Sequence, residues 1–453
     1  MFYRTFGGYL RLLLFGTALL ALGFLPAGEV LLTVLATADL HGNTSQIEKA
    51  IAPAVAAARK LDPQTIYIDA GDAAQGTLAV NLAQGGNVLA LLASAGCDIF
   101  VPGNHELEYG FEIFKKLLKS FPNTVLAANL HAPELEKSYQ PWVIKNVKGV
   151  KIAFIGMMLK DMTTAFPVDE KRFNTFAYSA ILRKNVDAVI RAGAEVIVLI
   201  QHAGKYSAGQ NIYELLAKFP EIDLVIGAHT HRADAGSSAA DAWYVQPPAR
   251  GSKLLKAVIR FDKRLRRVKN IESSLLDLPW FVTPYPAQAY EKVDKTNHDD
   301  PNFPARIIAG KVKSHWAIYA VESRNKLMEL LRDPAPDLLA YYRVFPYYDR
   351  IITVEVSGGE LYEIVREYLA FCRKRKMFLA VSGFSFSSSR GKLRTIHDLE
   401  RSKVRTLAIS AYAAAGAGGQ LPGIRRILKN KINHRQAENA PGILQLITNK
   451  GSY

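Results

Sequence analysis

Residues that can bind a metal ion or transfer a proton follow several apolar segments in the first half of the chain. They stand in the stretches ATADLHGN, DAGDAAQG, VPGNHELEYG, VLIQHAG and LVIGAHTH, and the candidate metal ligands are Asp39, His41, Asp72, Asn104, His202, His229 and His231. Ligands of parallel α/β sheets collect at the carboxyl ends of the strands. We therefore expect these side chains to converge, although roughly 190 residues separate the first from the last.

The donor types indicate which ions such a site would hold. Carboxylate, imidazole and amide oxygen suit Zn²⁺, Mn²⁺ or Fe²⁺, and the absence of cysteine argues against a structural zinc site. One ion needs about four to six donors, so seven donors suit two ions that share one carboxylate. A pair of ions can hold the attacking and leaving oxygens of a phosphoryl displacement.

Each short stretch alone is more typical of a capped loop or a turn than of a metal site. However, five of the ten histidines fall in these strand-end positions, each beside glycine or another donor. The other five lack such company and are interpreted as surface or structural residues: His131, His298, His315, His397 and His434.

The elements that must position these residues can be read from apolar runs. Predicted strands cover 30–37, 65–71, 98–103, 124–130, 151–157, 195–201 and 223–228, with helix-like stretches at 47–60 and 111–121. Continuous Val/Ile/Leu runs separated by helices indicate buried strands in an α/β architecture. The length of 453 residues favours two domains.

A passage rich in proline and charge, residues 278–304, is the predicted linker. After it, helix-like stretches at 326–332 and 360–375 and strand-like runs at 351–358, 378–387 and 406–412 predict a smaller α+β domain over residues 305–453. The Gly-rich loop 416–419 has the wrong spacing for a phosphate cradle and is interpreted as a turn.

The first 28 residues differ from the rest of the chain. Arg4 and Arg11 precede the apolar run LLLFGTALLALGFL, which small residues follow, and this order is typical of a secretory signal. An uncleaved membrane anchor is the alternative, but the run is shorter than the roughly 20 residues that a span prefers. We expect export to the periplasm, the cell surface or the medium. Cys97 and Cys372 form no disulfide framework, and Cys97 is predicted to lie in the core.

The net charge of +16 is unevenly distributed. Residues 1–245 hold 21 Lys and Arg against 22 Asp and Glu, whereas residues 246–453 hold 36 against 19. A basic second half attracts phosphates, nucleotides or anionic surface polymers, although a solvated, solubilising face is an equally good interpretation. No specific nucleic-acid motif is present, and the oligomeric state is not predicted.

The five ordered motifs D-x-H, G-D, G-N-H-E, H-x-G and G-A-H-T-H resemble the motifs D-x-H, G-D, G-N-H-E, H-x-G and G-H-x-[HQ] of the dinuclear, calcineurin-like metallophosphoesterases, specifically the exported 5'-nucleotidase branch. The matching residues are Asp39/His41, Gly71-Asp72, Gly103 to Glu106, His202-Ala203-Gly204, and His229/His231. The resemblance implies a four-layer α-β-β-α sandwich over residues 29–277, followed by the smaller domain.

The resemblance also implies a role for each residue. Asp39, His41, Asp72 and His231 would hold one divalent ion, and Asp72, Asn104, His202 and His229 the other, with Asp72 as the bridge. A metal-bound hydroxide would attack phosphorus in line. His105 would stabilise charge or protonate the leaving oxygen. Glu108 stands where the family usually has an Asp that orients this histidine.

In the second domain the resemblance is partial. Phe378 occupies the place of an aromatic residue that stacks on the nucleotide base. The second stacking Phe and the N-G-G-G-I-R stretch, whose Arg grips the nucleotide, have no counterpart. The predicted function is thus an exported phosphoesterase with two divalent ions and a nucleotide as its first expected substrate. The alternatives are another phosphomonoester, a cyclic phosphodiester, or a non-catalytic protein that binds anionic surface polymers.

Overall fold

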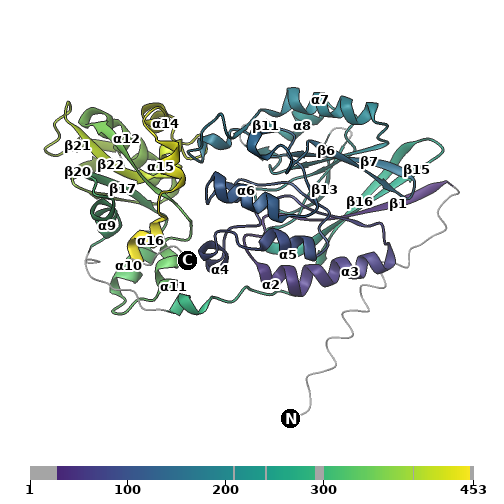
Figure 1. Ribbon diagram of the computed structural model, residues 1–453, viewed down its shortest axis with the longest axis horizontal. Helices are drawn as coiled ribbons and strands as arrows, with labels where there is room; N and C mark the ends of the chain where they lie inside the picture. Colours follow the sequence, from purple (N-terminus) through teal and green to yellow (C-terminus); the bar gives the residue numbers. More distant parts are fainter. Residues whose placement is uncertain (1–27, 208–209, 240–241, 291–299, 391, 449–453) are drawn as a thin grey trace, which may run out of the picture.

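The computed structural model describes residues 28–448 except 208–209, 240–241, 291–299 and 391. The predicted signal peptide lies outside the described residues except for Gly28, and so does part of the predicted linker. No helix within the described part of the chain is long and apolar enough to cross a membrane. Figure 1 shows two lobes, the first built from residues up to about 280 and the second from the remainder.

The first lobe contains two six-stranded sheets. In the first sheet, four strands run parallel and an antiparallel hairpin completes one side. Its order is β16 (Arg267–Asp277), β15 (Lys253–Asp262), β1 (Glu29–Thr37), β2 (Ile66–Asp69), β3 (Ile99–Phe100) and β4 (Thr124–Val125). In the second sheet the order is β13 (Asp234–Ala239), β14 (Ala242–Gln246), β12 (Leu224–Ile226), β9 (Val196–Gln201), β7 (Val150–Met157) and β6 (Trp142–Val147).

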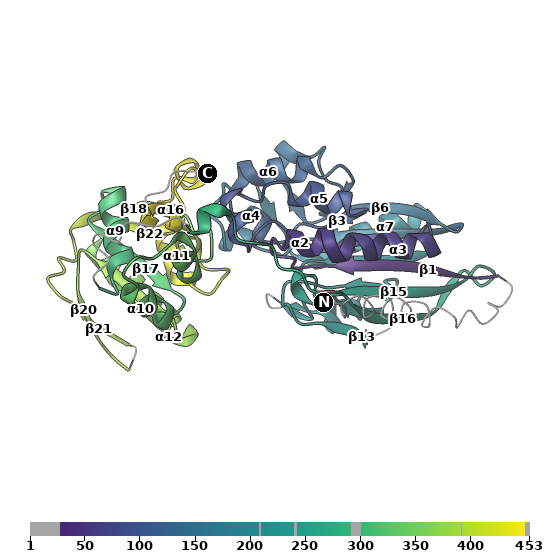
Figure 2. The same cartoon turned by 90° about the horizontal axis from the view of Figure 1, so that it is seen from below.

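The two sheets pack face to face, and helices cover both outer faces. Along β1, Val34 and Ala36 belong to the core between the sheets, whereas Leu35 faces the helices, as the period of two in a strand requires. The helices on the first sheet are α3 (Ala52–Leu61), α5 (Val88–Ser94) and α6 (Phe111–Ser120), and those on the second are α7 (Tyr178–Arg191) and α8 (Ile212–Leu216). Figure 1 and Figure 2 show this arrangement from two sides. The predicted four-layer α-β-β-α architecture is confirmed.

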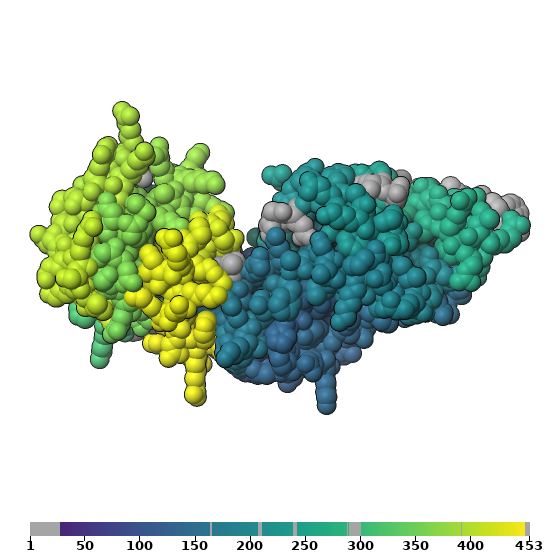
Figure 3. All heavy atoms as spheres, turned by 90° about the horizontal axis from the view of Figure 1, so that it is seen from above, coloured from purple at the N-terminus to yellow at the C-terminus, as the bar shows by residue number. Residues whose placement is uncertain are grey.

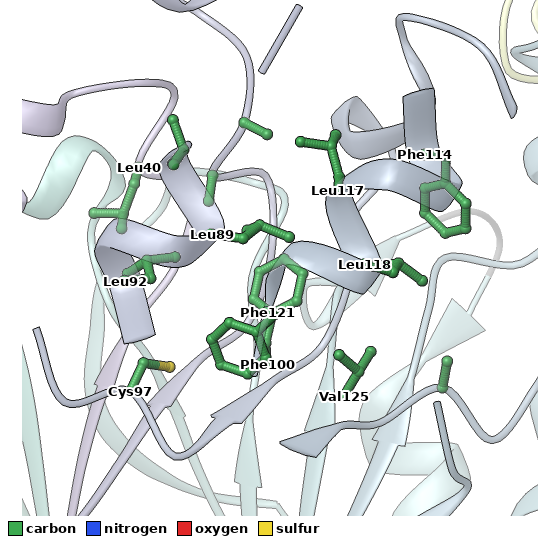
Figure 4. Close-up of a cluster of buried hydrophobic side chains, with 14 of the residues drawn as sticks. Leu40, Leu89, Leu92, Cys97, Phe100, Phe114, Leu117, Leu118, Phe121 and Val125 are labelled. Carbon is green, nitrogen blue, oxygen red and sulfur yellow. The ribbon is translucent and has the colours of Figure 1, made fainter. Parts of the chain in front are cut away.

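The core under α5 and α6 is drawn in Figure 4. Cys97 lies there fully buried beside Leu92 and Phe100, and its thiol is free. The prediction that Cys97 is a core residue is confirmed. Cys372 is likewise buried and free, in the core of the second lobe.

All seven predicted strands of the first lobe are present, although several are shorter than predicted. The sequence did not predict β6, β13, β14, β15 or β16. The hairpin of β15 and β16 carries lysine or arginine at several positions, for example Lys256 and Arg260. These charges interrupt the apolar runs by which the buried strands were recognised, because an antiparallel strand can keep one face in water.

The second lobe is built on a four-stranded sheet with the order β18 (Ile351–Ser357), β22 (Val404–Ser410), β17 (Trp316–Val321) and β19 (Phe378–Ser382). The predicted helices correspond to α10 (Arg324–Arg332) and α12 (Gly358–Arg375), whereas β17 was not predicted. A separate hairpin, β20 (Phe386–Ser389) with β21 (Lys392–Ile396), extends away from the sheet. The other helices are α9 (Phe303–Val312), α11 (Leu338–Val344), α13 (Ala411–Ala415), α14 (Pro422–Leu428), α15 (His434–Glu438) and α16 (Ile443–Thr448).

The two lobes meet through hydrogen bonds and ion pairs. Tyr342 Oη donates to the carbonyl of Gly76 at 3.0 Å. Arg425 donates from Nη1 to the carbonyl of Thr163 at 2.6 Å and from Nη2 to Glu170 at 3.1 Å. Figure 3 shows the C-terminal residues, in yellow, seated against the first lobe. These contacts fix the orientation of the second lobe relative to the strand ends of the first.

A candidate dinuclear metal centre

The candidate ligands stand on loops that leave the carboxyl ends of five strands. Asp39, Asp72 and Asn104 follow β1, β2 and β3 of the first sheet, and His202 and His229 follow β9 and β12 of the second. Since both sheets point these ends toward the same edge of the sandwich, residues far apart in sequence come together. Thus the backbone N–H of His229 donates to the Asp39 carboxylate at 3.0 Å, across 190 positions.

Six of the seven candidate ligands form two groups of three. Within each group the ligand atoms all lie within 4.8 Å of one another. The first group is Asp39, His41 and His231, and the second is Asp72, His202 and His229. Asn104 adds a buried Oδ1 without a hydrogen-bond partner. The sequence resemblance implied the same division into two groups, and the ligand role of Asn104 and the shared role of Asp72 stay predictions.

Unpaired nitrogen and oxygen atoms in the second group fit a cation. His202 Nδ1 lies 2.6 Å from the carbonyl of Ala70, so this nitrogen carries the hydrogen and Nε2 presents a lone pair in the neutral ring. His202 Nε2 lies 3.0 Å from Asp72 Oδ2, but the two atoms lack hydrogen-bond geometry. His229 Nδ1 is also buried without a partner. A metal ion would satisfy buried ligand atoms that lie this close together without hydrogen-bond partners.

The protonation states of these groups also fit a bound divalent cation. Burial lowers the pKa of His41 and of His229 to about 4, so both rings are neutral, as metal ligands must be. Burial raises the pKa of Asp39 to about 7. For His202, burial lowers the pKa, but the Asp72 carboxylate more than offsets it and raises the pKa to about 10. A divalent cation would replace that proton and stabilise the Asp39 carboxylate.

Most of the ligands occupy a strained backbone. Among the described residues, fifteen other than glycine have a left-handed backbone, and five of them are candidate ligands: Asp39, His41, Asp72, His229 and His231. This conformation costs roughly 1–2 kcal/mol for an ordinary residue. Strained backbone conformations of this kind are found mainly at functional sites, where they fix the direction of a side chain.

Two glycines allow the loops after β2 and β3 to approach closely. A Cβ on Gly71 would come within 2.4 Å of the backbone nitrogen of Gly103, and a Cβ on Gly103 would come within 2.2 Å of Asp72 Oδ1. Any side chain at either position would push the two loops apart. The glycines of the G-D and G-N-H-E motifs are therefore required by packing at the centre.

His105 lies at the edge of the centre on a short turn, His105–Leu107. Its backbone N–H donates to Asp72 Oδ1 at 2.8 Å, and its Nδ1 contacts Glu108 Oε2. Burial lowers the pKa of His105, but Asp72 and Glu108 more than compensate and raise it to about 9. The predicted partnership of His105 with Glu108 is thus present as a contact, with the longer glutamate in the place of aspartate.

Glu106 is the last residue of the G-N-H-E motif, and the sequence alone indicates no role for it. Its buried carboxylate accepts hydrogen bonds from the backbone N–H groups of Gly103, Asp72, Ala73 and Ala74 at 2.7–3.0 Å. It holds the loops that carry Asp72 and Asn104. The only indication of this role in the sequence is that Glu106 is an acidic residue close to two turns that contain glycine.

Phe378 lies in the second lobe, at the start of β19 and opposite Val321 at the end of β17. The ring is half-buried, and the Arg324 guanidinium lies 5.8 Å from its centroid. This end of the sheet also carries Arg350, whose Nη1 would be 2.5 Å from a Cβ on Gly110 of the first lobe. Phe378 is therefore at the end of the sheet that faces the first lobe, and no described contact joins it to the ligands.

The remaining histidines lie away from both groups. His131, His315 and His397 are exposed, and His434 is half-buried near the interface between the lobes. His298 lies outside the described residues.

Comparisons with known proteins agree with this geometry. Residues 32–233 match the family model of calcineurin-like phosphoesterases. The NAD 5'-nucleotidase of Haemophilus influenzae is 31% identical over 178 residues, which are 38% of this chain and 28% of that protein. The matches with the first three curated relatives span 28–34% of their lengths.

Two solved structures show the same fold over nearly the whole chain. A Staphylococcus aureus protein assigned as a 5'-nucleotidase, in complex with alpha-ketoglutarate, has a TM-score of 0.70 at 17% identity and covers 93% of this chain and 97% of its own. A 5'-nucleotidase precursor of Thermus thermophilus has a TM-score of 0.59 at 16% identity, with coverage of 93% and 96%. The strand-end ligands and the family match together identify residues 32–233 as a calcineurin-like metallophosphoesterase domain, so this chain carries a domain of that family.

Proposed function

We propose that the protein is a metal-dependent phosphoesterase that hydrolyses phosphomonoesters, with nucleotides as the first expected substrates. The observation that carries this proposal is the pair of ligand groups at one edge of the sandwich, with His105 beside them. Two divalent ions, Zn²⁺ or Mn²⁺, would supply Lewis acidity that draws charge from a bound phosphoryl group and lowers the pKa of water.

The two groups differ in how far solvent reaches them. The side chain of His231 is 51% exposed, whereas Asp39 and His202 are fully buried. A substrate therefore approaches from the side of His231. The buried carboxylate of Asp72 lies between His202 and the backbone N–H of His105, and it links the metal ligands to the proton donor.

His105 holds the proton that the leaving group needs. Because Nδ1 contacts Glu108, the Nε2–H is the group that remains to donate. As water adds to phosphorus and gives up one proton to solvent, the phosphorus–oxygen bond to the alcohol breaks, and the departing oxygen takes the proton from Nε2. The ring of His105 then regains a proton from solvent. Glu108 orients the ring and stabilises its positive charge before this step.

A nucleotide is favoured among substrates by the 5'-nucleotidase relatives and by the aromatic Phe378 at the end of β19 that faces the first lobe. The missing second aromatic and the missing Arg of the second domain weaken this choice relative to other phosphomonoesters and cyclic phosphodiesters. Export is also part of the proposal, and it is supported by the basic and apolar composition of residues 1–28.

The test is hydrolysis by the purified full-length chain of AMP, a UDP-sugar, a 2',3'-cyclic nucleotide and an aryl phosphate, each with Mn²⁺ or Zn²⁺. Asp72→Asn serves as the control for the centre. We expect metal-dependent release of phosphate that the control loses. If only the aryl phosphate is hydrolysed, the nucleotide is excluded as substrate. A folded protein that hydrolyses none of the four substrates would refute the proposal that it is a phosphoesterase.

A surface that binds anionic polymers is the second candidate function. Residues 366–405 contain 11 Lys and Arg against 3 Asp and Glu. Exposed members of this cationic patch lie at the end of α12 and on the β20–β21 hairpin, and Arg373 donates to the carbonyl of Arg390 between these two elements. Binding of polyphosphate that weakens steeply with salt and survives Asp72→Asn would support this function.

A further inference from the structure

Arg250 lies beside the first ligand group but has no assigned role. It stands on the turn between β14 and β15, where its backbone N–H donates to the carbonyl of Asp39 at 2.8 Å. Its own carbonyl accepts a hydrogen bond from Asn43 Nδ2 at 3.4 Å. The backbone of Arg250 is thereby tied to the loop that carries Asp39 and His41.

The conformation of Arg250 is the one that the metal ligands adopt. Its φ is 61° and its ψ is 14°, in the left-handed region that five candidate ligands also occupy. The next residue is Gly251, for which φ 66° carries no strain. The chain therefore places an arginine in a conformation that glycine or asparagine would adopt more easily. Such an outlier at a candidate site suggests a role for its side chain.

The side chain of Arg250 is exposed, and no described residue pairs with its guanidinium in an ion pair or hydrogen bond. The backbone contact of Arg250 with Asp39 places this unpaired cation beside the first ligand group, whose His231 side chain is exposed as well. Its charge also opposes the burial that raises the pKa of Tyr342, on the second lobe.

We propose that Arg250 binds the phosphoryl group of the substrate at the open side of the first ligand group and selects phosphomonoesters over phosphodiesters. This inference rests on the proposed function. A guanidinium offers two parallel N–H groups that match two oxygens of a phosphate. A monoester presents a dianion with three free oxygens, whereas a diester presents a monoanion with two. The first lobe thus supplies a cation, while the Arg of the N-G-G-G-I-R stretch is absent from the second.

The experiment compares Arg250→Asn and Arg250→Lys with the wild type, all full-length and loaded with Mn²⁺. Asparagine tolerates the left-handed backbone, so the substitution removes the charge without adding strain. The matched control is Arg266→Asn. Arg266 is also exposed and left-handed (φ 50°), but it lies on the turn from β15 to β16, at the opposite end of the sheet.

Three quantities are measured: the dissociation constant of inorganic phosphate by calorimetry, and kcat/KM for 4-nitrophenyl phosphate and for bis(4-nitrophenyl) phosphate. Thermal unfolding verifies that each variant is folded. For Arg250→Asn we expect phosphate binding and monoester hydrolysis to fall at least about tenfold, as loss of a charge-assisted contact predicts, with the diester changed by less than about threefold. Arg250→Lys should recover part of the loss, and Arg266→Asn should behave as the wild type.

Unchanged phosphate binding in Arg250→Asn would overturn the inference, and so would equal losses on the two esters. The proposed function fails separately. If the wild type hydrolyses neither ester but binds phosphate more tightly than Arg250→Asn does, the proposed phosphoesterase activity is refuted. The proposed binding of phosphate by Arg250 is then retained.

Discussion

The carboxylate of Glu108 accepts a hydrogen bond from the backbone N–H of Tyr348, 2.8 Å away on the other lobe. The second oxygen of the same carboxylate contacts Nδ1 of His105. Glu108 is 7% exposed, so both contacts are shielded from water. The residue that contacts His105, the proposed proton donor, is thus itself held by the second lobe, and the position of that lobe is coupled to the ring of His105.

Glu108→Asp tests this coupling. Aspartate is one methylene shorter and cannot span from His105 to Tyr348. We expect kcat to fall roughly tenfold with KM little changed, because the ring is less well oriented while substrate binding is untouched. Steady-state kinetics on a phosphomonoester measure both constants. The control is Glu136→Asp, an exposed glutamate outside the centre. Kinetics equal to the wild type would show that one contact of Glu108 suffices.

Glu106→Gln replaces one of the two carboxylate oxygens, both of which accept from backbone N–H groups, by an N–H₂ group that cannot accept. Buried N–H groups are then left without a partner, so we expect a loss of about 2 kcal/mol in the free energy of unfolding. Urea denaturation in the presence of a chelator measures this loss without a contribution from bound metal. Mn²⁺ affinity should fall as well, because the loops that carry Asp72 and Asn104 are less fixed. Stability equal to that of the exposed control Glu112→Gln would contradict the role of Glu106.

Asp72→Asn tests the proposed bridge between the two ligand groups. An amide supplies one oxygen donor and no charge, so it is a poor ligand for two cations at once. We expect the wild type to retain two ions per chain, one for each group, and the variant at most one. Elemental analysis after metal loading and desalting gives the stoichiometry. Hydrolysis should fall at least about a hundredfold. Two ions retained by the variant would remove Asp72 from the bridging position.

Stability of the second lobe should depend on pH through Asp349. Burial raises the pKa of Asp349 to about 7, although Ser410 and the backbone of Tyr412 lower it by hydrogen bonding. A raised pKa means that the folded state binds the proton more tightly. The carboxyl group therefore costs stability progressively from about pH 4 to about pH 7, and the full cost is present above that.

Asp349→Asn removes this titration. The difference in melting temperature, wild type minus variant, should become smaller or change sign between pH 5 and pH 8, which differential scanning fluorimetry in chelator measures. A difference that stays constant over this range would show that Asp349 titrates normally.

Phe378→Ala tests whether the second lobe binds a nucleobase. If the ring stacks on a base, KM for AMP should rise about tenfold while KM for glycerol phosphate, which has no ring, stays within about twofold. The control is Phe386→Ala, another half-buried phenylalanine of the same lobe, on the outlying hairpin. Equal effects on both substrates would exclude Phe378 from base binding.

The sequence predicted the architecture well where the chain is buried on both sides. The apolar runs of β1, β7 and β9 are typical of strands between two layers, and the donors at the carboxyl ends of β1 and β9 followed from that order. It failed for β15 and β16, whose alternating charges face water. It also failed for β17, a short run, WAIYAV, whose neighbours in the sheet are far away in sequence.

The metal ligands of the candidate site could be predicted for similar reasons. Other contacts of the site could not be predicted from the sequence. Asp39 and His229 share motif and spacing signals, so their approach could be expected before the fold was known. The position of Arg250 could not, because its backbone contact with Asp39 joins residues 211 positions apart and no motif marks it. The second contact of Glu108 was equally hidden, since its partner is the backbone of Tyr348, which any residue would supply.

The pairing of β1 with β15 has a consequence for how the protein is made. Glu29 lies opposite Asp262, so the first described strand meets its antiparallel neighbour only after more than two hundred further residues. The first sheet cannot be completed while that stretch is still in the ribosome. Folding dominated by such distant contacts is slow. The growing chain thus remains incompletely folded, and accessible to chaperones, until its central region has been synthesised.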